Sequence, residues 1–106
     1  MKKRSKYNAV KTIVDGITFD SKKEANRYLE LKLMKQSGEI RDLELQVPYS
    51  IDVEGYHICK YTADFQYWDN NEKKVITEDC KGFRTPSYRL KKKLLKAVHG
   101  VEIYET

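Results

Sequence analysis

The chain has 106 residues, of which 21 are Lys or Arg and 16 are Asp or Glu, giving a formal net charge of +5. This length supports one hydrophobic core, so we expect a single domain over residues 1–106. No run approaches 18 consecutive apolar residues and no apolar segment follows the basic N-terminus, so we expect neither a membrane span nor a secretory signal. Cys59 and Cys80 lack the spacing of a disulfide framework or a zinc site, which favours a cytoplasmic protein. The basic surplus favours a polyanionic partner such as nucleic acid.

The N-terminal third predicts a basic arm, a hairpin and a helix. Residues 1–11 form the arm, and residues 12–20 alternate β-forming residues around Asp15-Gly16, a dipeptide typical of a type I′ hairpin turn. Residues 21–38 predict a helix that starts at the N-cap Ser21 and ends at Gly38. The inward stripe expected on this helix consists of Ala25, Tyr28, Leu29 and Leu33, widened by Leu31 and Met34.

The rest of the chain alternates strand-like and helical segments. The predicted strands are 40–47, which ends at Pro48, then 49–53, 57–68 and 73–81. A second helix is expected over 87–100 and a closing strand over 101–105. After the N-terminal hairpin the order is α-β-β-β-α-β, which predicts an α/β fold with a central mixed sheet flanked by helices.

The turn between the last two central strands sets the predicted register. Asn70-Asn71 tolerates the positive φ of a two-residue type I′ turn, so Asp69 is expected to pair with Glu72. Counting back along both strands places Asp64 opposite Thr77.

Two carboxylates and a lysine then share one face of the predicted sheet. Asp79 is the diagonal neighbour of Asp64, roughly 7–8 Å away, and Lys81 follows Asp79 at period two. Carboxylate oxygens suit Mg²⁺, which makes bound water more acidic and stabilises charge on phosphate, and Lys81 is placed to orient that water. A solvated face with cross-strand ion pairs explains the same spacing, and the neighbouring Glu78 leaves open which acid is the second ligand.

The order of these residues resembles a known pattern. Asp64 followed by Asp79-Cys80-Lys81 is similar to the PD-(D/E)xK nuclease superfamily, in which an acid precedes acid-x-lysine on the next strand. Longer segments resemble small phage-encoded members of that superfamily, which are described as Holliday-junction-resolvase-like endonucleases or as proteins of unknown function. These segments are "KYNAVKT", "DGITFDSKKEANRYLELKL", "LELQVPY", "YTADFQY" and "EDCKGFRTPSYRLKKKL".

The resemblance implies an endonuclease-like core and a metal-dependent endonuclease that hydrolyses DNA, with Mg²⁺ as cofactor and Mn²⁺ as a substitute. It assigns Asp64 and Asp79 as metal ligands, Lys81 as a catalytic residue and Glu24 as the acid that completes the site. The chain departs from the pattern at Ala63, where the superfamily has proline, and in having two adjacent acids before Cys80.

Several residues can be interpreted in two ways. Ser21-x-x-Glu24 is also a capping box, and Gln46 fits either the site or a polar strand end. The basic residues that follow the motif fit contact with a phosphate backbone or a solvated helix face. They are Arg84, Arg89, Lys91, Lys92 and Lys93.

Three functions are consistent with the sequence. A DNA endonuclease is favoured, selective for branched DNA in phage recombination or replication within the bacterial cytoplasm. The alternatives are a nuclease-fold protein that binds DNA without cutting it and a phage protein–protein adaptor. A domain this small needs a partner copy to cut both strands, so a homodimer is also expected.

Overall fold

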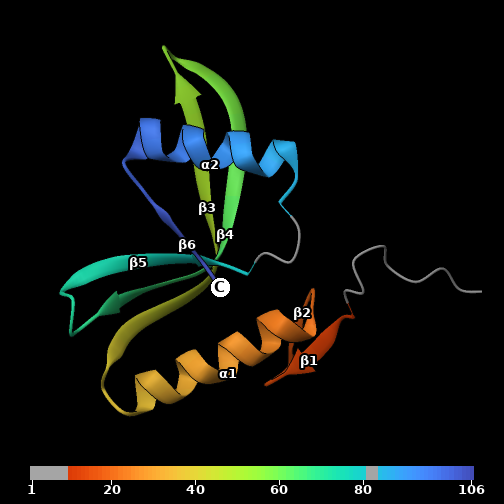
Figure 1. The fold of residues 1–106 in the computed structure, drawn as a ribbon, viewed down its shortest axis with the longest axis vertical. Helices are drawn as coiled ribbons and strands as arrows, with labels where there is room; N and C mark the ends of the chain where they lie inside the picture. The colour runs from red at the N-terminus through yellow and green to blue at the C-terminus, as the bar shows by residue number, and fades with distance from the viewer. Residues whose placement is uncertain (1–9, 81–83) are drawn as a thin grey trace, which may run out of the picture.

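The fold is a mixed α/β arrangement in which helices flank a mixed sheet, as predicted (Figure 1). The computed structural model describes residues 10–80 and 84–106. The four-stranded sheet has the order β3-β4-β5-β6, with β3, β4 and β5 antiparallel and β6 parallel to β5. No helix within these described ranges is long and apolar enough to cross a membrane.

The N-terminal hairpin forms a separate two-stranded sheet. β1 (Thr12–Val14) pairs with β2 (Ile17–Phe19) in antiparallel register. The turn residues Asp15 and Gly16 have φ values of 52° and 74°, which a type I′ turn requires. The predicted hairpin is therefore confirmed.

Helix α1 (Lys22–Gln36) has the predicted ends but a different buried face. Ser21 is the N-cap, and Gly38 has a positive φ of 82° just beyond the helix. Leu31 is fully buried, whereas Leu29 and Leu33 are 41% and 66% exposed. The predicted stripe was wrong at these two leucines because apolar residues occur on all sides of this helix, so spacing alone did not identify its inner face.

Strands β3 (Ile40–Val53) and β4 (Tyr56–Asp69) form a long hairpin. Pro48 does not divide β3, contrary to the prediction, because β3 is an edge strand and one side of an edge strand needs no ladder donor. Glu54 and Gly55 form the turn with φ values of 52° and 82°.

The hairpin packs against both helices through two separate clusters. Phe65 and Tyr67 of β4 belong to a buried cluster with Leu31 of α1. Tyr61 and Ala63 of the same strand belong to a second cluster that includes residues of α2 (Pro86–His99). Figure 1 shows α2 crossing one half of the hairpin and α1 lying beside the other half. β4 therefore passes from one core to the other between Ala63 and Phe65.

The turn before β5 (Lys74–Asp79) is longer than predicted, which corrects the register by two residues. Asp69 pairs with Lys74 rather than Glu72, and Gln66 rather than Asp64 lies opposite Thr77. The Asp69 carboxylate accepts hydrogen bonds from the backbone N–H groups of residues 71 and 72, which closes a four-residue turn. A shift of two residues keeps each side chain on its predicted face.

Helix α2 and strand β6 (Ile103–Glu105) complete the fold. Thr85 is the N-cap of α2, Pro86 is its first residue, and Gly100 ends it with a φ of 70°. β6 then pairs with the far side of β5, so its last residues lie beside the end of β5.

Candidate functional site

Asp64 and Asp79 face each other across β4 and β5. The backbone N–H of Asp64 donates to Asp79 Oδ1 at 3.2 Å, and the N–H of Cys80 donates to Asp64 Oδ2 at 2.8 Å. Asp79 is 1% exposed, and Asp64 is half-buried. The corrected register thus places Asp64 level with Asp79, instead of in the diagonal position expected from the sequence. They lie where β4 passes between the two cores.

Glu24 and Gln46 form a second polar contact, between α1 and β3. Leu45 pairs with Phe65 and Val47 with Ala63, so Gln46 lies level with the Asp64 position of the neighbouring strand. Gln46 Nε2 donates to Glu24 Oε2 at 3.4 Å, and Glu24 is 6% exposed.

The backbone of Glu24 also takes part in the helix cap. Its N–H donates to Ser21 Oγ at 3.1 Å, so the capping interpretation holds for the backbone while the carboxylate contacts Gln46. Within the described part of the chain, the structure does not bring Glu24 into one metal-binding group with Asp64 and Asp79.

Glu78 points away from the acid pair toward α1. Arg27 holds its carboxylate with two bonds, Nε to Oε1 at 2.8 Å and Nη2 to Oε2 at 2.6 Å. The hydroxyl of Tyr67 donates a third, short hydrogen bond. The hydrogen bond to Glu78 raises the pKa of Arg27, and burial followed by the bond to Glu78 raises the pKa of Tyr67. Of the two adjacent acids, Asp79 is the one beside Asp64.

Cys80 packs against the buried cluster that contains Leu31 and Phe65. Its Sγ is 3.1 Å from the hydroxyl oxygen of Thr106, and burial raises the pKa of its thiol, with a smaller contribution from the charges of Asp64 and Glu24. Lys81, the predicted catalytic lysine, lies outside the described residues, as does the arm before residue 10.

A neutral polar row continues from the acid pair along the same two strands. Gln66 and Thr77 are direct cross-strand partners, two residues from Asp64 and Asp79 respectively. The Tyr49 hydroxyl makes a short hydrogen bond to Gln66 Oε1 and lies 3.4 Å from Thr77 Oγ1. The sequence pattern had given no role to this row, because Tyr49 comes from a different strand.

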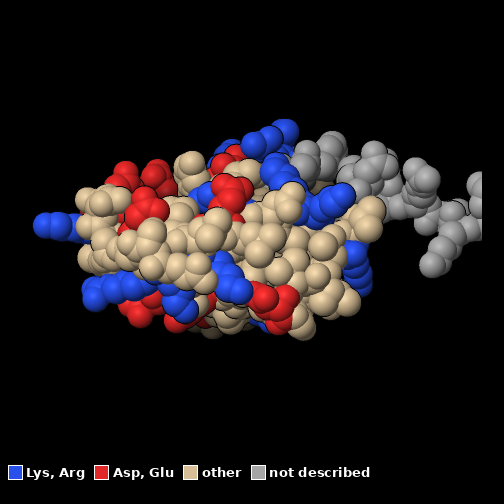
Figure 2. Space-filling model, turned by 90° about the horizontal axis from the view of Figure 1, so that it is seen from below, with Lys and Arg blue, Asp and Glu red and all other residues tan. Residues whose placement is uncertain are grey.

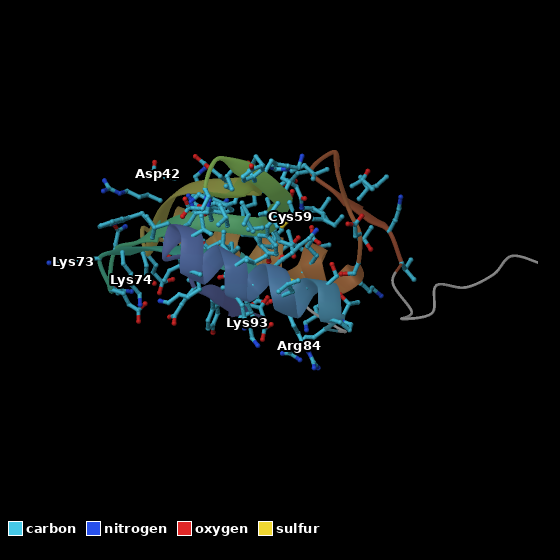
Figure 3. All side chains as sticks on the ribbon, turned by 90° about the horizontal axis from the view of Figure 1, so that it is seen from above. Asp42, Cys59, Lys73, Lys74, Arg84 and Lys93 are labelled. Carbon is cyan, nitrogen blue, oxygen red and sulfur yellow. The ribbon has the colours of Figure 1, made fainter. Side chains whose placement is uncertain are left out.

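The predicted DNA-binding residues, on α2 and just before it, separate into two groups. Arg84, Arg89, Lys92 and Lys93 line an open groove of about 610 Å³ between α2 and β6, whereas Lys91 is half-buried outside that lining. Figure 3 shows Arg84 and Lys93 on the same side of α2, with Lys73 and Lys74 at the other end of the sheet.

Glu105 connects this groove to the acid pair. It is the cross-strand partner of Asp79, and its carboxylate accepts hydrogen bonds from Arg84 Nε at 3.0 Å and from the Tyr88 hydroxyl at 2.6 Å. Lys92 Nζ lies 3.5 Å from the same carboxylate. The bonds from Tyr88 and Arg84 lower the pKa of Glu105. Sequence reasoning missed Glu105, since a single acid near the end of the chain carries no motif.

The donor set fits a hard divalent cation without forming a cage. Among residues 10–80 and 84–106, no three His, Cys, Asp or Glu side chains gather into a metal-binding group. Mg²⁺ commonly binds only one or two protein carboxylates, because it keeps several of its waters. Two facing carboxylates are therefore enough for it.

A family model described as "Protein of unknown function (DUF1064)" matches residues 4–104 of the chain. No curated protein and no solved structure matches.

Proposed function

This chain belongs to the DUF1064 family, and we propose that it is a metal-dependent DNA endonuclease of the PD-(D/E)xK type. It hydrolyses phosphodiester bonds with Mg²⁺ as cofactor and Mn²⁺ as a substitute. The preferred substrate is branched DNA, and the setting is phage recombination or replication in the bacterial cytoplasm, with a homodimer as the form that cuts both strands.

The single observation that carries this proposal is the pairing of Asp64 with Asp79. Two carboxylates from adjacent strands meet at a point where one is buried and the other is half-exposed. Each carboxylate accepts a backbone N–H from the opposite strand, so both acids are held at one point of the sheet, and two carboxylates are a number that suits Mg²⁺. The α-β-β-β-α-β order agrees with the core that the sequence resemblance implies.

The roles of the chain's own residues follow from this placement. Asp64 and Asp79 hold the cation, and Glu24, fixed by Gln46, shapes the side of the site next to α1. When bound, Mg²⁺ supplies positive charge for the phosphate oxygens and makes water more acidic. Lys81, two residues beyond Asp79, orients the attacking water and accepts its proton or offsets phosphate charge.

The basic residues beside Asp79 supply the contacts to DNA. Arg84, Arg89, Lys92 and Lys93 line one groove, and Lys91 extends the basic surface of α2. Such contacts with phosphate give affinity without sequence preference and weaken as salt rises. On the face seen in Figure 2, basic and acidic side chains alternate around a largely uncharged centre.

The test compares wild-type protein with Asp64→Asn and Asp79→Asn. Each is incubated with supercoiled, linear and four-way branched DNA in Mg²⁺, Mn²⁺ or EDTA, and Mg²⁺ binding is measured separately by calorimetry. We expect cleavage only with metal, a loss of at least about 100-fold in both variants, and weaker Mg²⁺ binding. Asp42→Asn is the matched control, because Asp42 is 77% exposed and asparagine tolerates its φ of 56°.

Each contrary result has a distinct meaning. Cleavage by Asp79→Asn at the wild-type rate rejects the proposed site. Salt-sensitive DNA binding without any cleavage favours the non-cutting accessory protein, and the absence of salt-sensitive binding favours the adaptor.

A further inference from the structure

The groove between α2 and β6 is lined by a regular row of side chains from α2. Tyr88, Lys92 and Lys96 recur at every fourth residue, and Arg84 continues the row just before the N-cap. Four residues advance an α-helix by about 6 Å, close to the separation of successive phosphates along an extended nucleic-acid strand. The row therefore presents a phenol hydroxyl at Tyr88 and cations at Lys92 and Lys96 at intervals that suit a phosphodiester backbone, with Arg84 at the end of the row.

Two acids on the opposite wall of the groove form ion pairs with the cations of this row. Glu105 contacts both Arg84 and Lys92, at 3.0 Å and 3.5 Å, and Glu102 lies 3.4 Å from Lys96. The cations nevertheless remain accessible, since the side chains of Arg84, Lys92 and Lys96 are 49%, 40% and 57% exposed. Ion pairs this exposed are weak and readily exchanged for another anion.

The carboxylate of Glu105 is coordinated as a bound phosphate would be. A guanidinium, an ammonium and a phenol hydroxyl all converge on it, and it is only 18% exposed. Its neighbour across the strand is Asp79. An anion that replaced Glu105 on Arg84 and Lys92 would thus lie beside the acid pair.

We propose that this groove is the track for the backbone of one DNA strand, and that Glu105 is an internal substitute for a phosphate which the strand displaces. The inference rests on the proposed function, because it assigns the path by which that substrate reaches Asp79. Glu105 is a positioning residue in this scheme: it holds Arg84 and Lys92 in place without DNA and weakens binding by competing for them. Glu102 acts in the same way on Lys96.

The test measures DNA binding rather than cleavage. A fluorescently labelled 20-base-pair duplex is titrated with wild-type protein and with Glu105→Gln in EDTA, by anisotropy at several salt concentrations. Glutamine keeps an acceptor for Tyr88 but lacks the charge. We expect the variant to bind about threefold to tenfold more tightly, since two exposed ion pairs no longer compete. The slope of log affinity against log salt should steepen by about 0.9 for each cation that gains a phosphate contact.

Two further variants distinguish the proposed role of Glu105 from a general effect of charge on DNA binding. Glu44→Gln makes the same charge change at an exposed position of β3 outside the groove and should tighten binding less. The gain from Glu105→Gln should also vanish when Arg84 and Lys92 are both changed to glutamine. Thermal unfolding of each variant shows whether its fold is retained.

The outcomes separate the two proposals. If Glu105→Gln binds like Glu44→Gln or more weakly than wild type, while wild type binds and cuts DNA, the substitute role of Glu105 is overturned and the nuclease proposal stands. If wild type neither binds nor cuts DNA, both are overturned.

Discussion

The buried ion pair of Arg27 and Glu78 explains an acid that the sequence places on the core side of β5. Glu78 is fully buried, and Arg27 is 18% exposed, so neither charge is well solvated. Removing one partner of such a pair leaves an uncompensated buried charge, which is more destabilising than the loss of a surface pair. The pair also draws Glu78 away from Asp64, and this leaves Asp79 as the acid at the site.

We expect Arg27→Met to lower the free energy of unfolding by about 3 kcal/mol in urea denaturation. Adding Glu78→Gln should recover about 1–2 kcal/mol, because the buried charge is then removed while Tyr67 keeps an acceptor. Arg41→Met is the control, since Arg41 is 64% exposed, and it should cost less than about 1 kcal/mol. A double variant no more stable than Arg27→Met would show that the charge of Glu78 is not what destabilises the single variant.

The N-terminal hairpin is attached to α1 through its turn. Asp15 accepts hydrogen bonds from the Tyr28 hydroxyl at 2.9 Å and from Lys32 Nζ at 2.6 Å. The bond from Lys32, followed by the bond from Tyr28, lowers the pKa of Asp15. A carboxyl with a lowered pKa in the folded state stabilises the fold above its unfolded pKa, and this contribution is lost as pH falls through the folded pKa.

Titration of Asp15 by carboxyl ¹³C NMR should therefore give a midpoint below the ordinary aspartate value. Lys32→Gln should move that midpoint upward. Asp15→Asn should leave the hairpin formed, because Asn-Gly is a favoured type I′ turn, but should increase amide exchange in β1 and β2. An unchanged midpoint in Lys32→Gln would mean that Lys32 does not stabilise the ionised form of Asp15.

At the scale of elements, the sequence predicted the helix ends and the first turn better than it predicted the pairing of strands. Ser21, Gly38 and the Asp15-Gly16 turn act within a few residues, so the sequence was sufficient to place them. The assignment of side chains to the two faces of β4 and β5 was also correct, since period-two alternation is insensitive to a register shift of two residues. The predicted diagonal placement of Asp64 and Asp79 was wrong, because it depends on the true length of the turn after Asp69.

The sequence did not predict which side chains from distant segments contact each other. Arg27 and Glu78 are 51 residues apart, and Arg84 and Glu105 are 21 apart. No spacing rule connects such positions, because the packing of α1 and α2 on the sheet decides which charges meet. The sequence therefore identified acids and bases that belong to the candidate site, but not the partners that orient them.

Within the described residues the molecule contains two cores, and both strands of the long hairpin, β3 and β4, contribute to each. Leu31 and Phe65 lie in the cluster under α1, while Leu95 and Tyr61 lie in the cluster under α2. Because β4 contributes to both, loss of either cluster should remove the support of the other. The acid pair lies at this junction, so its geometry depends on both helices being in place.

We expect Leu95→Ala to lower the free energy of unfolding by about 2–5 kcal/mol, because Leu95 is completely buried. The loss should appear equally in the fluorescence of Trp68, at the α1 end of β4, and in far-ultraviolet circular dichroism, since β3 and β4 both run through the two cores. Leu90→Ala is the matched control: Leu90 is on the same helix but 60% exposed, and its truncation should cost less than about 1 kcal/mol. If the Trp68 transition kept its wild-type midpoint in Leu95→Ala, the two cores would unfold independently, and the acid pair would join two separable units instead of lying within one.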